Sequence, residues 1–591
     1  MNDDVGRIIE VNGVDVKAKL FSLLPPFLII NGKPYSAPKI NSFVKTKVGL
    51  DVIICQIVGE YNVEDLNSKT DYYMDLRVKG YIENGKFIQG LRMLPIVSSN
   101  ISLLSEKEYN IIFQYNKESS FRIGQDLFEQ NRSIYINCNH VIPSHVGVFG
   151  NTGSGKSNTL ALILQRYLNL LLNVSESKNS RILIFDLNNE YGDEAICSRN
   201  LKTIYTLSTS SKSKDRIPFN FNDLTEDDMG VLLNATSKMQ MPVLKYAFKQ
   251  LKKENDANYY IKYLTSILRN KQKDLFNSIR FNLQEYIGNI EDIFWSEKHE
   301  KFCKIKNDGQ WYFSDNDDFY SEVVSKIIIN LPDNSLDRLK FELYFSVAKE
   351  CVHGVNGEYL TPLLSRAEKI FDDLHKIIEF ENNEVDVFGD NNIAIVQLAD
   401  VNTDMTMTVT SLLSNALFSK QIKSKGNEKV KSIINIVIDE AHNILYKDDD
   451  SRIHNSTLYS FEKIVKEGRK FGIFLMIASQ RPSDISNTVL SQLHNYFLHK
   501  LINPNDLYQI RKTVAFLDEN SMNFLTVLAP GECILSGTCV AMPTFVKIDE
   551  LSNENKPNSS NVVLIGDYGI LMNSENRESS KRRRRIRKTH K

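Results

Sequence analysis

The sequence lacks the features that mark secreted, disulfide-bonded and membrane-spanning proteins. Its seven cysteines are an odd number and none are spaced as CxxC, which argues against a disulfide framework and a structural zinc site. No run of about 18 clean apolar residues occurs, so we expect no transmembrane helix. The opening residues, MNDDVGRIIEVNG, do not combine a basic region with an apolar one. We therefore expect no signal peptide, and a cytoplasmic protein with reduced thiols.

An excess of charge of either sign is also absent. The chain has 72 Lys and Arg against 73 Asp and Glu, a net charge of -1, so any contact with DNA must come from a local patch. A composition of 42% hydrophobic and 25% charged residues is ordinary for a soluble globular protein. The length of 591 residues predicts roughly three or four domains. No internal repeat is present.

The first 120 residues have the pattern of a small β-barrel. Short runs rich in β-branched residues, such as Phe43–Val48 and Asp51–Val58, are separated by turn signals. The segment YIENGKFIQG contains Asn84-Gly85, a strong hairpin signal, because a type I′ turn needs positive φ at both central residues. Several short strands at close spacing favour a barrel over residues 1–120.

Beyond the barrel, buried strands alternate with helices. A strand, a Gly-rich turn, a helix and a second strand follow one another in residues 121–221, the order of a parallel sheet. Residues 222–388 have apolar residues at helical spacing and little glycine, which predicts an all-α insertion. Buried strands return in residues 389–555. A C-terminal extension, 556–591, contains the basic run KRRRRIRK, which could bind DNA or an acidic partner or could be a solvated end.

The Gly-rich turn fits the phosphate-binding pattern GxxxxGK[ST] in full, between a predicted strand and a predicted helix. Glycines let successive backbone N–H groups turn toward phosphates, and the start of the helix adds its positive dipole end. Lys156 would neutralise the β- and γ-phosphates of ATP, and the Ser157 hydroxyl would ligate Mg²⁺. The residues predicted to bind the ATP phosphates are Gly150, Asn151, Thr152, Gly153, Ser154, Gly155, Lys156, Ser157 and Asn158.

A second motif is the apolar run Ile433–Ile438, which ends in Asp439 and Glu440. A strand this apolar belongs inside a parallel sheet, with its carboxyl end toward the ligand crevice. Asp439 would hold the Mg²⁺ shell and Glu440 would polarise the attacking water. The alternative is a pair of surface acids that cap the next helix, which the phosphate loop disfavours. Together the motifs predict an ATP hydrolase with the α/β P-loop NTPase fold and a RecA-like parallel sheet.

Five motifs in this order resemble the HerA/FtsK superfamily, and HerA-type ATPases most closely. HVGVFGNTGSGKSN is similar to the phosphate loop of that family, and IDEAHN to its hydrolysis strand. FDLNNEY, which contains Asp186 and Glu190, resembles its second-strand motif, while EGRKFG and ASQRPS resemble two downstream motifs. The N-terminal region looks like the small β-barrel of HerA proteins, and LAPGECILSG like their closing strand pair.

The resemblance implies roles for further residues. Gln480 would sense the γ-phosphate; the alternative is a buried amide that satisfies loop backbone. Arg469 would act in trans on the ATP of a neighbouring subunit, because its guanidinium stays charged and stabilises transition-state charge. The alternatives are that Arg469 is a solvated helix-end charge or that Arg481 supplies this function. Asp186 and Glu190 would lie near the nucleotide or would cap the turn after their strand.

A trans-acting arginine requires a closed head-to-tail ring. The resemblance implies a hexamer that uses ATP and Mg²⁺ to draw double-stranded DNA through its centre. It also implies a separately encoded effector, such as a NurA-type nuclease in DNA end processing or a sirtuin-like NAD hydrolase in anti-phage defence. No effector motif occurs in this chain, so we expect such a partner. Two alternatives are an ATP-gated ring scaffold that activates the effector without sustained translocation and an ATPase that acts on protein substrates.

Overall fold

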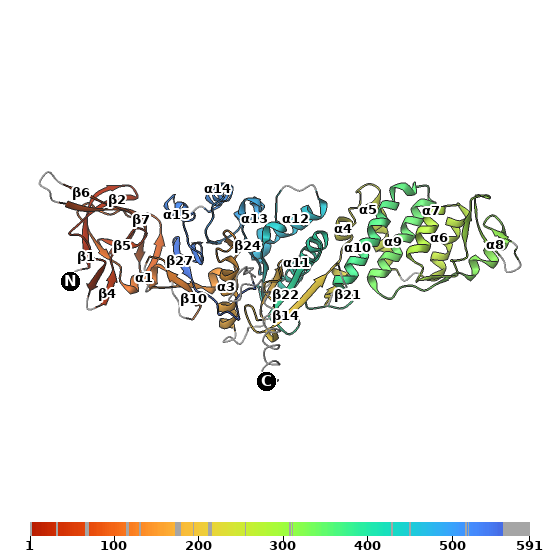
Figure 1. The fold of residues 1–591 in the computed structure, drawn as a ribbon, viewed down its shortest axis with the longest axis horizontal. Coiled ribbons are helices and arrows are strands. Elements are labelled where there is room, and N and C mark those ends of the chain that lie inside the picture. Colours follow the sequence, from red (N-terminus) through yellow and green to blue (C-terminus); the bar gives the residue numbers. More distant parts are fainter. Residues whose placement is uncertain are drawn as a thin grey trace, which may run out of the picture.

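The computed structural model describes residues 3–558 apart from short internal segments. These are 31–32, 65–69, 114–117, 129–131, 172–178, 193, 211–214, 254–255, 306–308, 310, 427–428, 448–450, 515–516 and 518. The described chain is elongated, with a barrel, a central sheet with its helices, and a distal insertion in a row (Figure 1). No described helix is both long and apolar enough to cross a bilayer. The predicted basic tail, KRRRRIRK, lies outside the described residues.

Six of the described strands near the N-terminus close into a barrel, which confirms the predicted barrel. In order around it they are β2 (Asp15–Leu20), β1 (Asp4–Asn12), β9 (Asn100–Leu103), β5 (Phe43–Val48), β6 (Asp51–Glu64) and β7 (Thr70–Glu83), and β7 pairs with β2 to close it. Alternate side chains such as Ile53 and Leu76 fill the interior. The Asn84-Gly85 turn joins β7 to β8 (Lys86–Gln89), with positive φ at both residues.

A second sheet forms the centre of the molecule. Its eleven described strands are, in order, β11 (Ser133–Asn137), β10 (Ser120–Asp126), β27 (Thr544–Ile548), β26 (Glu532–Gly537), β25 (Asn495–Leu498), β12 (Val146–Phe149), β24 (Ile473–Ser479), β23 (Ile433–Ile438), β13 (Ser180–Asp186), β22 (Ile393–Asp400) and β14 (Lys202–Ser208). Neighbours from β25 to β14 are parallel, and the remaining pairs are antiparallel. The predicted parallel sheet is therefore present.

Helices cover both faces of this sheet, which explains why its strands are apolar throughout. Ile184 of β13 belongs to the apolar cluster that includes α3 (Lys156–Leu171). Its neighbour Phe185 belongs to the cluster of α11 (Thr403–Lys425) and α12 (Arg452–Glu467). The shorter described elements are β3 (Phe27–Ile30), β4 (Lys33–Ser36), α1 (Glu106–Ile112), α2 (Cys138–Val141), α13 (Asn487–Ser491), α14 (Pro504–Thr513) and α15 (Glu519–Phe524).

The insertion leaves and rejoins the core through two paired strands. These are β15 (Ile217–Asn220) and β21 (Ile378–Glu381), which run parallel with Ile217 opposite Ile378. Its helices are α4 (Glu226–Leu232), α5 (Gln240–Leu251), α6 (Ala257–Arg269), α7 (Lys273–Asn282), α8 (Asp317–Glu322), α9 (Ser335–Val352) and α10 (Thr361–Ile377). They extend away from the sheet on the side opposite the barrel (Figure 1).

The prediction that this insertion is all-α is not confirmed. Between the helices lie β16 (Ile287–Gly288), β17 (Phe294–Ser296), β18 (Lys301–Ile305), β19 (Trp311–Phe313) and β20 (Ile328–Ile329). β17, β18 and β19 form an antiparallel sheet in which Trp295 pairs with Phe302 and Ile305 with Trp311. Aromatic residues favour strands, and the fully buried Phe302 packs this sheet on the core. These strands were not predicted, because they are short alternating runs within a region where apolar residues mostly recur at helical spacing.

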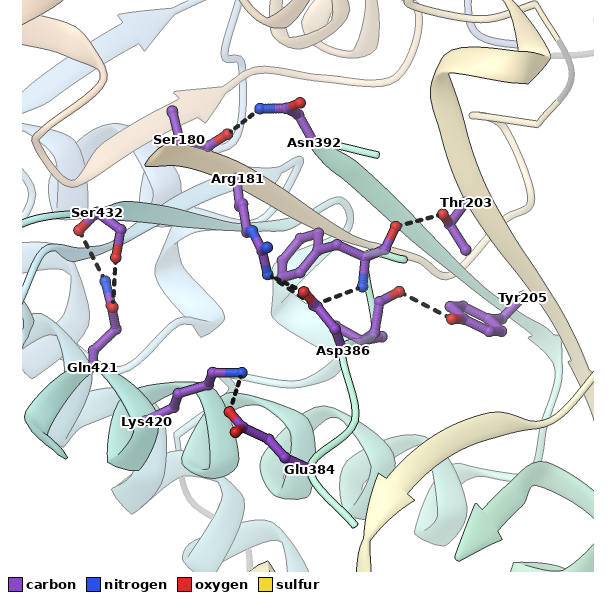
Figure 2. A network of polar contacts seen from close by, with 12 residues as sticks. Ser180, Arg181, Thr203, Tyr205, Glu384, Asp386, Asn392, Lys420, Gln421 and Ser432 are labelled. Atoms are coloured by element: carbon purple, nitrogen blue, oxygen red, sulfur yellow. Dashed lines mark hydrogen bonds and ion pairs between the residues drawn. The ribbon is translucent and has the colours of Figure 1, made fainter. Parts of the chain in front are cut away.

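The segment that follows β21 is fastened to the amino ends of the sheet strands. Figure 2 shows Arg181 of β13 beside Asp386, with Nη1 donating to both carboxylate oxygens at 2.8 and 2.6 Å. Tyr205 of β14 donates to the carbonyl of Val387 at 3.0 Å, and Lys420 of α11 pairs with Glu384 at 2.8 Å. The return of the insertion is thus tied to two strands and one helix of the core.

Candidate active site

The predicted phosphate-binding segment lies between the carboxyl end of β12 and the start of α3. Gly153 and Gly155 have φ of +73° and +108°, a region that other residues rarely adopt. At Gly150, an added Cβ would lie only 2.5 Å from the Cβ of His499, which follows β25. The glycines of the motif therefore stand where the backbone must turn sharply or approach a neighbouring strand end.

Lys156 directs its amine back over this loop. The side chain is buried, and Nζ donates to the carbonyl oxygen of Asn151 at 3.2 Å. Burial lowers the pKa of Lys156, while the nearby carboxylates of Glu440, Asp439 and Glu190 act to raise it. The loop thus holds one buried cation among three acids, an arrangement suited to the negative charge of a nucleotide phosphate and a divalent cation.

Asp439 and Glu440, at the carboxyl end of β23, face the start of α3. The Ser157 hydroxyl donates to Asp439 Oδ2 at 3.4 Å, and the Glu440 N–H donates to Asp439 Oδ1 at 2.9 Å. Glu440 itself has left-handed φ and ψ of 52° and 46°, which costs a residue with a side chain about 1–3 kcal/mol. Burial raises the pKa of Glu440, and the Lys156 charge opposes this.

Three buried oxygens at this edge have no hydrogen-bond partner among the described residues. They are Ser154 Oγ, Glu190 Oε2 and Glu440 Oε2, and the last lies 3.3 Å from His442 Nδ1 without hydrogen-bond geometry. Buried polar atoms of folded proteins are ordinarily paired. Hydroxyl and carboxylate oxygens beside a buried lysine fit a phosphate, Mg²⁺ and ordered water, so the donor set suits the predicted ligands.

Gln480 follows β24, and this strand lies between β12, which precedes the predicted phosphate loop, and β23, which ends at Asp439 and Glu440. The Thr152 hydroxyl of the phosphate loop donates to Gln480 Oε1. Next to it, the Ser479 hydroxyl lies 3.2 Å from His442 Nδ1. The structure thus brings Gln480 to the loop from a strand more than 300 residues further along the chain.

The turn after β13 brings Glu190 toward the same edge. Asp186 is buried and accepts the N–H groups of Glu190 and Tyr191, both at 2.9 Å, so it caps this turn. Burial raises the pKa of Asp186 to about 6. Burial and the charge of Asp439 also raise the pKa of Glu190, which hydrogen bonds from Asn188 and Ser157 oppose.

The side chains of three predicted residues make no described hydrogen bond to this cluster. Arg469 is exposed in the turn after α12, at the amino end of β24, and burial together with the Arg469 charge lowers the pKa of His494 near the same end of the sheet. Arg481 is exposed, with Nη1 3.9 Å from Asp484 Oδ2. The Asn158 amide donates to the carbonyl of Asp549 at 3.1 Å, so it holds the segment after β27.

Two residues of the site had no role assigned from sequence. Tyr191 is fully buried, and its hydroxyl donates to Asp439 Oδ2 at 2.6 Å. His499 is fully buried beneath the phosphate loop, with Nδ1 2.9 Å from the carbonyl of Glu532 and Nε2 2.9 Å from the Thr159 hydroxyl. The FDLNNEY motif contains Tyr191 and could have identified it as a site residue. No local sequence pattern marks His499.

Residues 121–417, about half of the chain, match the family described as the central domain of helicase HerA. Among curated proteins, the chain is 26% identical over 510 residues to the DNA double-strand break repair helicase HerA of Sulfurisphaera tokodaii, covering 85% of this chain and 83% of that protein. It is 29% identical over 467 residues to the protein of the same name from Saccharolobus solfataricus, covering 78% of this chain and 74% of that protein.

Among solved structures, the chain is similar to VirB4 of Thermoanaerobacter pseudethanolicus. The two are 15% identical with a TM-score of 0.41, and the match covers 74% of this chain and 98% of that one. The bacterial conjugative coupling protein TrwB is 12% identical with a TM-score of 0.38, covering 72% of this chain and 89% of that one.

Proposed function

This chain belongs to the HerA family of ATPases, and on that premise we propose that it is a motor that moves along double-stranded DNA. The motor is a homo-oligomeric ring, a hexamer, that works with a separately encoded effector. The observation that carries the proposal is the meeting of Lys156, Ser157, Asp439 and Glu440 at one edge of a parallel sheet. Two relatives are named as DNA double-strand break repair helicases, which supports DNA as the track.

Hydrolysis in this proposal is divided among side chains of the site. Lys156 and the loop N–H groups bind the β- and γ-phosphates of ATP, and Ser157 and Asp439 hold Mg²⁺. The bound Mg²⁺ supplies positive charge against the charge that develops on the phosphates. Glu440, whose buried Oε2 has no described partner, orients the attacking water and accepts its proton. Gln480 responds to the presence of the γ-phosphate.

Arg469 acts in trans in this proposal. It is exposed at the amino end of β24, whereas the phosphate loop lies at the carboxyl end of β12, so it serves a neighbouring subunit rather than its own. Arg481 follows the carboxyl end of β24 and is the competing arginine. A mixture of Lys156→Ala and Arg469→Ala proteins tests this. Each is inactive alone, and mixed rings regain hydrolysis where an intact phosphate loop meets an intact arginine; no recovery excludes the trans role of Arg469.

The effector is a nuclease of the NurA type or a sirtuin-like NAD hydrolase, in DNA end processing or anti-phage defence. The charge of the insertion supports a protein partner there, because residues 222–388 hold 29 Asp and Glu against 21 Lys and Arg. An acidic surface repels DNA phosphates. The same feature favours the alternative function, an ATP-gated ring scaffold that activates the effector without sustained translocation.

The ATPase rate of the purified protein, with and without linear duplex DNA at two salt concentrations, tests the motor. We expect DNA to stimulate hydrolysis and the stimulation to fall steeply as salt rises, because contacts with phosphates release counterions. The Lys156→Ala protein is the control for contaminating ATPases. Hydrolysis that DNA does not change would overturn the motor and favour the scaffold.

A further inference from the structure

Tyr191 makes a contact that the proposed hydrolysis does not use. Its side chain is fully buried, and its hydroxyl donates to Asp439 Oδ2 at 2.6 Å. The other carboxylate oxygen, Oδ1, accepts the N–H of Glu440 at 2.9 Å. Each oxygen of Asp439 therefore has a donor that fixes its direction. A carboxylate has about four lone-pair sites, so both oxygens keep capacity for the Ser157 hydroxyl and for water.

Two buried charges hold the turn that carries Tyr191. Asp186 accepts the N–H groups of Glu190 and Tyr191, both at 2.9 Å. Lys202 of β14 is equally buried and donates from Nζ to the carbonyls of Gly192 at 3.3 Å and Ala195 at 2.7 Å. Burying a carboxylate and an amine is costly unless both are well paired. Here the carboxylate satisfies backbone donors and the amine satisfies backbone acceptors of one short turn.

A third contact comes from the segment after β27. The Asn558 N–H donates to the carbonyl of Glu190 at 2.8 Å, and the Ile196 N–H donates to the carbonyl of Asn555 at 3.2 Å. The turn is thus held from the sheet below and from the C-terminal segment beside it. With the turn held on these sides, the Tyr191 hydroxyl has one position relative to Asp439.

We propose that Tyr191, held by Asp186 and Lys202, is a positioning residue that orients the Asp439 carboxylate for Mg²⁺-dependent nucleotide binding. The inference rests on the proposed role of Asp439 in holding Mg²⁺. Without the Tyr191 hydroxyl, Oδ2 loses a charge-assisted hydrogen bond and the carboxylate gains rotational freedom. The aromatic ring only fills the apolar cluster around α3 and β13, so removal of the oxygen alone separates orientation from packing.

The test compares Tyr191→Phe with Tyr167→Phe. Tyr167 of α3 is a matched control, because it is buried and its hydroxyl lies 2.6 Å from the Ser180 hydroxyl, away from Asp439. Binding of a fluorescent ADP analogue is titrated with Mg²⁺ and repeated in EDTA, without DNA. For Tyr191→Phe we expect the Mg²⁺ concentration for half-maximal binding to rise about tenfold, which is about 1.4 kcal/mol. Binding in EDTA and the Tyr167→Phe protein should match the wild type.

A shift below about twofold, or equal weakening in EDTA and Mg²⁺, would overturn the positioning role. A second measurement combines Tyr191→Phe with Asp186→Asn. If Asp186 acts through Tyr191, the double variant should bind Mg²⁺-nucleotide no worse than the weaker single variant. Additive losses would refute the link between them. Because DNA is absent from every titration, a failed motor assay and a failed positioning role are separate outcomes.

Discussion

The central sheet has an amino edge, where its parallel strands begin, and a carboxyl edge, where they end. Polar side chains are paired differently at these two edges. At the amino edge, shown in Figure 2, the Asp386 carboxylate takes two contacts from Arg181, and the Gln421 amide donates to the Ser432 carbonyl at 3.0 Å while accepting from the Ser432 hydroxyl at 2.9 Å. At the carboxyl edge, buried oxygens of Ser154 and Glu440 have no described partner. The groups drawn in Figure 2 are paired with one another, although His145 Nε2 at the same edge has no described partner, whereas the carboxyl edge combines its unpaired oxygens with the left-handed backbone of Glu440.

This difference shows where the chain accepts a cost in stability. A buried polar atom without a partner costs about 1–3 kcal/mol. Glu440 adds a left-handed backbone at the same place. Such costs collect where a ligand later supplies the missing partners. Substitutions at the carboxyl edge should therefore change activity far more than stability, and substitutions at the amino edge should do the reverse.

The largest expected effect is that of Glu440→Gln. Loss of the carboxylate proposed to accept the water proton should lower the ATPase rate about 100- to 10,000-fold. Nucleotide binding should persist, since Lys156 and the loop are unchanged. Steady-state hydrolysis and binding of a fluorescent nucleotide are measured together, with Glu384→Gln at the amino edge as the matched control. A Glu440→Gln protein with near wild-type turnover would assign the proton to another group.

The second largest effect on hydrolysis is expected for Lys156→Ala. Removal of the buried amine proposed to bind the ATP phosphates should lower hydrolysis about 100- to 1,000-fold and should also weaken nucleotide binding. The midpoint temperature of thermal unfolding should be no lower than in the wild type, because burial disfavours the charged amine of Lys156 in the folded protein. Lys420→Ala, which breaks a surface pair with Glu384, is the control and should leave hydrolysis intact. A large loss of stability in Lys156→Ala would contradict this prediction and would show that Lys156 stabilises the fold.

Substitutions at the amino edge should lower the stability of the fold rather than its activity. Asp386→Asn removes the charged partner of Arg181, whose side chain is about one third exposed, as is that of Asp386. We expect the free energy of unfolding to fall by about 1 kcal/mol, with nucleotide affinity unchanged. Chemical denaturation and nucleotide titration on the same protein measure both. Weaker nucleotide binding without loss of stability would contradict the division between the edges.

A further effect concerns the pH dependence of stability and involves one buried histidine at each edge. Burial lowers the pKa of His499, beneath the phosphate loop, to about 4, and that of His145, before β12, to about 3. The unfolded chain binds these protons near pH 6.5, whereas the folded chain does not, so stability should fall as pH drops below about 6.5. His499→Asn and His145→Asn should each flatten the dependence of unfolding free energy on pH between about 4 and 6.5. If the slope of unfolding free energy against pH is the same in both variants as in the wild type, the histidines do not cause the loss of stability at low pH.

Much of the sheet could be predicted from sequence because its signals are local. Ile433–Ile438 is β23 with the predicted bounds, and the Gly-rich motif stands between a strand and a helix as predicted. The antiparallel pair β10 and β11 was not predicted, because its short runs have no strong turn signal between them. The limits at residues 121, 222, 389 and 556 stay predictions.

The site was predictable only in part because side-chain partners are set by distant segments. Asn158 is predicted to bind the ATP phosphates, and its side-chain amide bonds to the carbonyl of Asp549, which is 391 residues away along the chain. The contact of Tyr191 with Asp439 spans 248 residues. No local pattern indicates either pairing. The roles of Lys156, Glu440 and the other predicted site residues remain for the experiments above.

The parallel pairing of β15 with β21 decides how the chain could be shortened by protein engineering. Insertions that leave through two antiparallel strands can be deleted and replaced by a tight turn. Here the end of β15 and the beginning of β21 lie at opposite ends of the pair, because Ile217 faces Ile378 and Asn220 faces Glu381. Joining parallel strands takes a crossover of about a dozen residues or more. A deletion of the insertion therefore has to carry a replacement helix or an extended linker, and a shortened chain closed by a tight turn should not fold.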